Sequence, residues 1–248
     1  TYMPGEIPSL RVSVRCGANI EDDLSVRLTV RPPKGRAKRL TRKVPVETGT
    51  CRFEIPLSSP CEAGYYDVET VLRRGGATLE ETVSGFWGRD EDLLKEGKPF
   101  STDSDMIRRG NEVYPFVGTT YMSSRYHRKF LWCANPGIWD RDFAEMSVEG
   151  VSVIRTGIWA GHRYLMPEPG LWREDTLRAL DAFILTAQRY EIPVIFTFFS
   201  FIPPLYGGEN AYLDPRSLAA QHKFVKIIIE RYKDCPSLIW DWINEPSM

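Results

Sequence analysis

The run of residues 193–199 constrains the fold more than any other part of the chain, because it is almost wholly apolar (Pro-Val-Ile-Phe-Thr-Phe-Phe). A strand with such a sequence is typically buried on both faces, as in a parallel sheet that is covered by helices. The residues before it repeat at helical spacing, at Leu177, Leu180, Phe183, Ile184 and Ala187. The sequence therefore predicts a helix that leads into a buried parallel strand.

The same alternation extends over residues 113–248. We predict strands at residues 116–121, 151–155, 193–199 and 238–243, and helices at residues 138–149, 177–187 and 218–232. Gly150 is a plausible stop for the first of these helices. Strands that alternate with helices of this length pair in parallel, so this region is predicted to form an α/β layer.

Residues 1–88 follow a different period. Apolar and polar residues alternate in residues 10–14, 24–30, 51–55 and 66–72, and Pro/Gly-rich turns separate these segments. Period two with one buried face predicts short antiparallel strands, here an immunoglobulin-like β-sandwich. Residues 89–112 are polar and rich in residues that break regular structure, so we predict a linker between two domains.

Composition excludes several classes of function. The formal net charge is −1 and no long block carries one sign, so a nucleic-acid partner is not predicted. No apolar run approaches the roughly 20 residues that span a membrane. The 5 cysteines show no paired spacing and the 3 histidines are scattered. We therefore predict no metal site.

The sequence is compatible with more than one cellular compartment. The N-terminus shows no charged region followed by an apolar core, so no signal peptide is visible. This feature and the odd number of cysteines favour the cytoplasm, with secretion as the alternative if the N-terminus is processed.

Polar residues end the last predicted strand. The apolar run 238–243 leads directly into Asn244 and Glu245, followed by Pro246. In barrel enzymes the catalytic side chains lie at the carboxyl ends of the strands, and a carboxylic acid at this position is a candidate acid catalyst. The alternatives are a surface or helix-capping glutamate and, for Asn244, a turn residue before proline.

Residues 113–248 resemble the first four strands of clan A glycoside hydrolases, the (β/α)8 group that includes β-galactosidases, β-mannosidases, β-glucuronidases and family 5 cellulases and mannanases. Four segments carry the resemblance, namely residues 118–121, 150–155, 207–212 and 244–246. The chain departs from the pattern at Thr120, where mannanase-like members often have Asn. It departs again at residues 198–200, where many family 5 enzymes have His. The resemblance therefore implies a multidomain fold: a β-sandwich at 1–88, a linker at 89–112 and the first half of a (β/α)8 TIM barrel at 113–248.

The resemblance also implies roles for individual residues in a retaining double-displacement hydrolysis of β-glycosides. Acid/base and nucleophilic carboxylates suffice for this reaction, so no cofactor is implied. Glu245 would be the general acid/base, which Trp240 and Trp242 would desolvate to favour its protonated form. Asn244 would bind the sugar 2-hydroxyl. Arg155 would orient the nucleophile, which the pattern places after a seventh strand and so outside this chain. The alternative for Arg155 is a salt bridge to a local acid.

Other residues near the predicted strand ends are candidates for substrate contact. Tyr121 and Trp159 are aromatic residues that could stack on a sugar, and His162 could reach a sugar hydroxyl, although packing roles are equally compatible with each aromatic residue. Asp241 is expected to be a buried acid that supports the site without catalysing the reaction.

Two classes of function are compatible with the sequence. The first is a β-glycosidase, present here as its N-terminal portion, that acts on a glycoside or on an oligo- or polysaccharide. The alternative is a non-catalytic carbohydrate-binding protein or a truncated, inactive glycosidase-like protein. In either case, half a barrel would expose strand edges, so self-association or pairing with a complementary C-terminal half-barrel is predicted.

Overall fold

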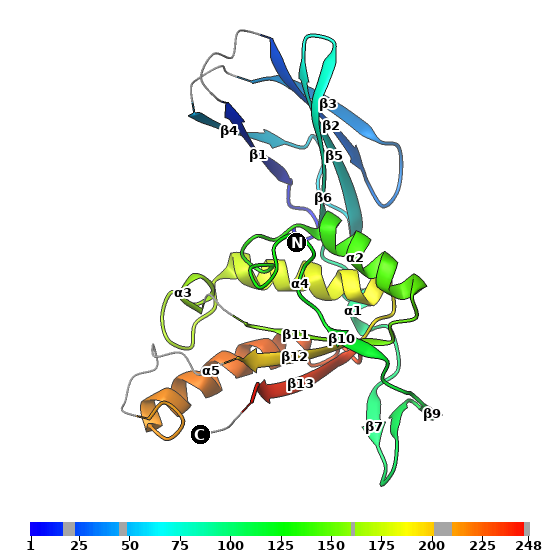
Figure 1. The fold of residues 1–248 in the computed structure, drawn as a ribbon, viewed down its shortest axis with the longest axis vertical. Helices are drawn as coiled ribbons and strands as arrows, with labels where there is room; N and C mark the ends of the chain where they lie inside the picture. The colour runs from blue at the N-terminus through cyan, green and yellow to red at the C-terminus, as the bar shows by residue number, and fades with distance from the viewer. Residues whose placement is uncertain (17–22, 45–48, 160–161, 201–209, 246–248) are drawn as a thin grey trace. The chain divides into compact units, whose positions relative to one another are not determined.

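The computed structural model describes residues 1–16, 23–44, 49–159, 162–200 and 210–245. The chain divides into two compact units (Figure 1). The first contains Thr1–Asp90 together with Asn135–Ile138, and the second contains Glu91–Ala134 together with Trp139–Met248. Within the described residues, no helix combines the length and the apolar character that crossing a bilayer requires.

The first unit contains two antiparallel sheets. The smaller sheet pairs β1 (Ser9–Cys16) with β4 (Gly49–Pro56), and the larger has the order β3 (Lys38–Lys43), β2 (Leu24–Arg31), β5 (Gly64–Arg74) and β6 (Ala77–Gly88). The strands predicted from period two are confirmed as β1, β2, β4 and β5. The pattern did not identify β3 or β6. The residues of β3 are mostly exposed and charged, so no apolar face repeats along it, and the first five residues of β6 are exposed.

One hydrophobic core serves both sheets of this unit. Its members come from β1, β2, β4, β5 and β6, and β2 contributes Leu24, Val26, Leu28 and Val30, which are at most 3% exposed. These residues are two apart and therefore lie on one face of the strand, as alternation requires. The immunoglobulin-like character of this unit stays a prediction.

Residues 89–112 contain regular structure where a linker was predicted. They form α1 (Glu91–Lys95) and three short antiparallel strands, β7 (Phe100–Thr102), β8 (Ile107–Arg109) and β9 (Glu112–Val113). The Arg109 guanidinium lies 5.6 Å from the ring centroid of Phe100 and 5.5 Å from that of Tyr114. Cation–π contacts of this kind hold a polar segment together without the apolar periodicity on which a sequence prediction relies.

The second unit is built on a four-stranded parallel sheet. Its strands are β10 (Gly118–Thr120), β11 (Val153–Gly157), β12 (Val194–Phe199) and β13 (Leu238–Ile243), and they are neighbours in chain order. The connecting helices are α2 (Pro136–Val148), α3 (His162–Leu165), α4 (Glu174–Arg189) and α5 (Pro215–Tyr232). The predicted alternation of strands and helices and the predicted parallel pairing are confirmed.

Helix α5 begins at a clear capping signal. The Asp214 carboxylate accepts a hydrogen bond of 2.8 Å from the backbone N–H of Arg216, and Pro215 occupies the first turn. The Arg216 guanidinium and backbone N–H together lower the pKa of Asp214 to about 2. A side-chain acceptor followed by proline is the arrangement that a helix N-terminus favours, so this start is encoded locally.

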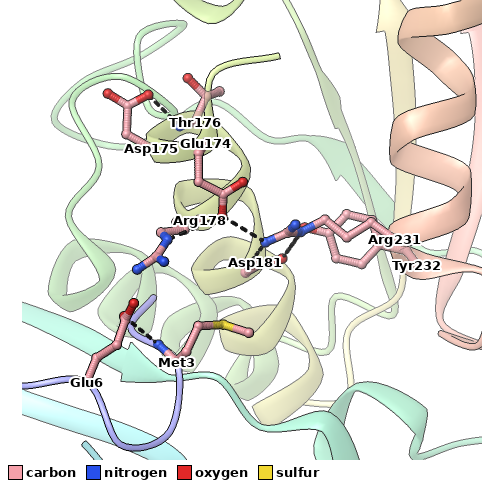
Figure 2. Close-up of polar contacts among 9 residues, drawn as sticks. All are labelled: Met3, Glu6, Glu174, Asp175, Thr176, Arg178, Asp181, Arg231 and Tyr232. Atoms are coloured by element: carbon pink, nitrogen blue, oxygen red, sulfur yellow. Dashed lines mark hydrogen bonds and ion pairs between the residues drawn. The ribbon is translucent and has the colours of Figure 1, made fainter. Parts of the chain in front are cut away.

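Helices α4 and α5 are joined by a buried polar contact (Figure 2). The Asp181 carboxylate of α4 accepts hydrogen bonds from Arg231 Nε and Nη2, at 2.8 and 2.6 Å, and from the Tyr232 hydroxyl at 2.7 Å. Asp181 is fully buried, so its charge depends on these donors from α5. The hydrogen bonds to Asp181 raise the pKa of Arg231.

Candidate functional site

The strand register brings polar side chains of the parallel sheet together. Arg155 of β11 pairs with Ile195 of β12, and Thr197 of β12 pairs with Asp241 of β13. Because alternate side chains point to the same face, Arg155, Thr197 and Asp241 share one face of the sheet. Three polar residues from three consecutive strands therefore lie close together in the structure. In the sequence they belong to three separate, mostly apolar segments.

Backbone contacts fix the carboxyl ends of these strands. The N–H of Asn244 donates to the carbonyl oxygen of Phe199 at 2.8 Å, and the N–H of Ile158 donates to that of Thr197 at 3.0 Å. A Cβ atom at Gly157 would lie 2.2 Å from the Thr197 carbonyl oxygen. Strands β11 and β12 therefore approach each other at a position that only glycine accommodates without a shift of the backbone.

Arg155 is the centre of the polar cluster. Its Nε and Nη2 donate to Asp241 Oδ2 at 3.0 and 2.6 Å, and its Nη1 donates to Asn244 Oδ1 at 3.0 Å. The Thr197 hydroxyl donates to the same Asp241 oxygen at 2.7 Å. The salt bridge to a local acid, which the sequence left as the alternative for Arg155, is therefore present. The guanidinium also contacts Asn244, one of the predicted site residues.

Trp159 lies beside this cluster. The Arg155 guanidinium carbon is 5.2 Å from the centroid of the Trp159 ring, within the range of a cation–π contact. The carbonyl oxygen of Trp159 accepts a hydrogen bond of 3.1 Å from the Ser200 hydroxyl, which ties the end of β11 to the end of β12. The buried Trp159 Nε1 finds no acceptor in the part of the chain that the structure describes.

Glu245 follows Asn244 at the carboxyl end of β13 and is exposed. Its φ of +46° lies in the left-handed region, which is uncommon for a residue other than glycine. The expected desolvation by tryptophan is not found. Trp242 is itself 50% exposed, and Trp240 stacks on Phe198 with ring centroids 5.3 Å apart. Both indoles lie on the face of the sheet that carries Phe198, because side chains alternate along β13 and Asp241 is on the opposite face.

Tyr121 lies in the core and not on an accessible surface. It is 5% exposed, packs against Phe143 and Phe183 with both ring centroids 5.5 Å away, and donates its hydroxyl to Asp142 at 2.7 Å. Burial, followed by the neighbouring Asp142 charge, raises its pKa. Tyr121 therefore has a packing role instead of the predicted stacking on a sugar, because its ring is buried against Phe143 and Phe183.

The remaining predicted contact is His162, which begins α3, and its side chain lies outside the described residues. Sequence reasoning did not single out Thr197, although a lone hydroxyl within the apolar run 193–199 was a visible signal. Asp241 was expected to be buried, and its side chain is 27% exposed. Among residues with described positions, no three His, Cys, Asp or Glu side chains are placed to share a metal ion.

Comparison with known proteins gives information about the fold of the chain only. No family model and no curated protein matches the chain. Among solved structures, it is similar to the exo-β-1,4-mannosidase of Opitutaceae bacterium strain TAV5, at 18% identity and a TM-score of 0.52 over 59% of this chain and 28% of that one. A GH5_18 protein of Streptomyces cattleya in complex with GlcNAc has 15% identity and a TM-score of 0.43, over 50% of this chain and 32% of that one.

A family 39 glycoside hydrolase of Bacteroides cellulosilyticus WH2 has 15% identity and a TM-score of 0.31, over 98% of this chain and 42% of that one. The chain thus spans less than half the length of each of these three proteins. The likeness to the exo-β-1,4-mannosidase, which has the highest TM-score of the three, shows that the chain has a glycoside hydrolase-like fold.

Proposed function

We propose that this chain supplies the acid/base half of the active site of a retaining β-glycosidase. One observation carries the proposal: Asn244 and Glu245 lie at the carboxyl end of β13, and Arg155 of β11 binds the Asn244 side chain at 3.0 Å. In (β/α) barrels, catalytic groups gather at this end of the strands. The consecutive parallel order of β10 to β13 supports a partial barrel as the scaffold.

In this proposal Glu245 is the general acid/base. It protonates the glycosidic oxygen as the bond to the anomeric carbon breaks, and it later removes a proton from the water that releases the sugar. Exposure leaves its carboxyl group accessible to a substrate, and its left-handed backbone is a strained conformation of the kind that clusters at functional sites. We propose that the bound sugar supplies the desolvation that favours the protonated form.

The opposing nucleophile is a carboxylate about 5–5.5 Å from the acid/base in retaining enzymes. Asp241 does not suit this role, because one of its oxygens already accepts three hydrogen bonds from Arg155 and Thr197. We therefore place the nucleophile outside residues 1–248. Asn244 binds the sugar 2-hydroxyl and Arg155 holds the site in place, with Trp159 and His162 as further candidate substrate contacts.

The test is Glu245→Gln in the complete protein, assayed on a panel of aryl β-glycosides. General acid catalysis contributes about 10²–10⁴-fold, so kcat on a substrate with a poor leaving group should fall by roughly this factor. A leaving group that is stable as an anion needs no proton, so its first step should be much less affected. The matched control is Glu149→Gln, a change at an exposed glutamate just after α2, which should leave both rates unchanged.

The stereochemistry of the first product tests the retaining mechanism separately, because double displacement gives a product with the anomeric configuration of the substrate. Unchanged hydrolysis of poor leaving groups by Glu245→Gln would exclude the proposed role. A wild-type protein that binds oligosaccharides but cleaves none of the panel would instead support the non-catalytic alternative.

A further inference from the structure

We infer that Asp241 is a positioning residue, which fixes the guanidinium of Arg155 and, through it, the orientation of the Asn244 amide. The inference rests on the proposed function, since it concerns how the same site recognises the substrate. It assigns to Asp241 an indirect role in selecting substrates that carry a hydroxyl group next to the anomeric carbon.

The first step is the rigidity of Arg155. Two of its nitrogens, Nε and Nη2, donate to the same oxygen of Asp241 at 3.0 and 2.6 Å, which prevents rotation of the planar guanidinium. The Thr197 hydroxyl donates to that oxygen from the intervening strand at 2.7 Å, and Thr197 is fully buried. The Trp159 ring, 5.2 Å away, is a further contact of the guanidinium. Asp241 and its neighbours therefore hold Arg155 in a single orientation.

The second step is the polarity of the Asn244 amide. Arginine has five N–H donors and no acceptor, so the group that faces Arg155 Nη1 must be the amide oxygen. That contact is 3.0 Å long. Because the amide is planar, the Nδ2 group is directed away from Arg155, with two N–H donors. In the described portion of the chain, Nδ2 has no hydrogen-bond acceptor of its own, so it is available to a ligand oxygen.

The third step separates this role from simple stabilisation. The Arg155 and Asp241 side chains are 30% and 27% exposed, so water competes for both charges. Partly exposed ion pairs contribute little to stability, whereas their geometry can still set the position of a third group. Loss of the Asp241 charge should therefore release Arg155 and the Asn244 amide while the fold remains intact.

The experiment compares two substrates in the complete protein: the aryl β-glycoside that the wild type cleaves fastest and its 2-deoxy analogue. With Asp241→Ala, which removes the acceptor oxygens, kcat/KM on the 2-hydroxy substrate should fall about tenfold or more, and kcat/KM on the 2-deoxy analogue should fall less than about threefold. The ratio of kcat/KM on the 2-hydroxy substrate to kcat/KM on the 2-deoxy analogue should therefore fall. A merely structural role would lower both values equally and overturn the inference.

One variant serves as the matched control. Asp175→Ala removes a carboxylate from the exposed start of α4 and should change neither substrate's kcat/KM.

A crystal structure of the Asp241→Ala protein provides a readout that does not depend on activity. The expected result is displacement of the Arg155 guanidinium and loss of its contact with Asn244. If both side chains keep their positions, the inference is wrong, whatever the enzyme hydrolyses. If they move but the wild type cleaves no glycoside, the positioning role stands and the proposed function fails.

Discussion

Arg155 and Asp241 are 86 residues apart in the chain, yet two guanidinium nitrogens of Arg155 donate to one carboxylate oxygen of Asp241, at 2.6 and 3.0 Å. The two residues belong to β11 and β13, which are separated in the sheet by β12. This contact, together with the hydrogen bonds from Arg155 to Asn244 and from Thr197 of β12 to Asp241, joins three strands in one polar site.

The three guanidinium donors of Arg155 should not be replaceable by the single ammonium group of lysine. Arg155→Lys keeps the positive charge, but an ammonium group cannot bind Asp241 through two nitrogens and reach Asn244 at the same time. We expect kcat/KM of the complete protein to fall by about tenfold or more with little change in melting temperature. Arg189→Lys, at a partly exposed arginine of α4, is the control and should change neither quantity. Full activity of Arg155→Lys would show that charge alone suffices.

The buried contact between α4 and α5 should dominate the stability of the second unit. Asp181→Asn removes the buried charged partner of the Arg231 guanidinium and leaves only the exposed Glu174, 3.8 Å from Arg231 Nη2. Loss of a buried partner typically costs about 3–5 kcal/mol. Urea unfolding measures this free energy. Asp175→Asn, in an exposed ion pair with Arg173, should cost less than about 1 kcal/mol. Equal losses in the two variants would mean that the burial of Asp181 has no energetic consequence.

Alkaline pH should destabilise the protein through Tyr121. Burial raises the pKa of this hydroxyl above the ordinary value of 10.0, so the native state retains a proton that the unfolded chain loses. The stabilisation is complete below pH 10 and is lost as pH rises above it, by about 1.4 kcal/mol per pH unit. Between pH 9 and pH 11, the unfolding free energy of the wild type should fall by about 1 kcal/mol more than that of Tyr121→Phe.

The same substitution has a separate cost at neutral pH. Tyr121→Phe deprives the Asp142 carboxylate of one donor while the N–H of Ser124 remains at 3.1 Å. A loss of about 1–3 kcal/mol is expected in urea unfolding at pH 7, because a partly buried carboxylate loses one of its two donors. Parallel pH profiles of the two proteins would contradict the raised pKa of Tyr121.

Acidic pH should weaken the start of α5. The pKa of Asp214 is lowered from 3.8 to about 2, so the contribution of its carboxylate is present above about pH 4 and is lost as pH falls through about 2. Asp214→Ala should therefore have a lower melting temperature than the wild type at pH 7, with the difference closing near pH 2. Asp214→Asn keeps a capping oxygen without the charge, so its melting temperature at pH 7 should lie between the two. A difference that is independent of pH would contradict the shifted pKa.

Local patterns in the sequence determined much of the second unit. The apolar run before Asn244 predicted β13, and helical spacing from Leu177 predicted α4, since both signals arise from residues that are close in the chain. The placement of Asn244 at a strand end was predicted in the same way. Arg155 was predicted to be the last residue of its strand, but it lies two residues before the end of β11. In the first unit, alternation predicted β2 but not β3, whose exposed charged residues have no apolar face to repeat.

Tertiary structure decided which side chains meet. The sequence did not determine that Arg155 would bind Asp241, that Thr197 would join them, or that Tyr121 would be buried beside Phe183. Each of these contacts depends on strand register or on helix packing between distant segments, whereas hydrophobic periodicity reports only which face of an element is buried. The sequence thus determined where the strands lie and which polar residues they carry. The partners of those residues were fixed only when the register of three parallel strands brought them together.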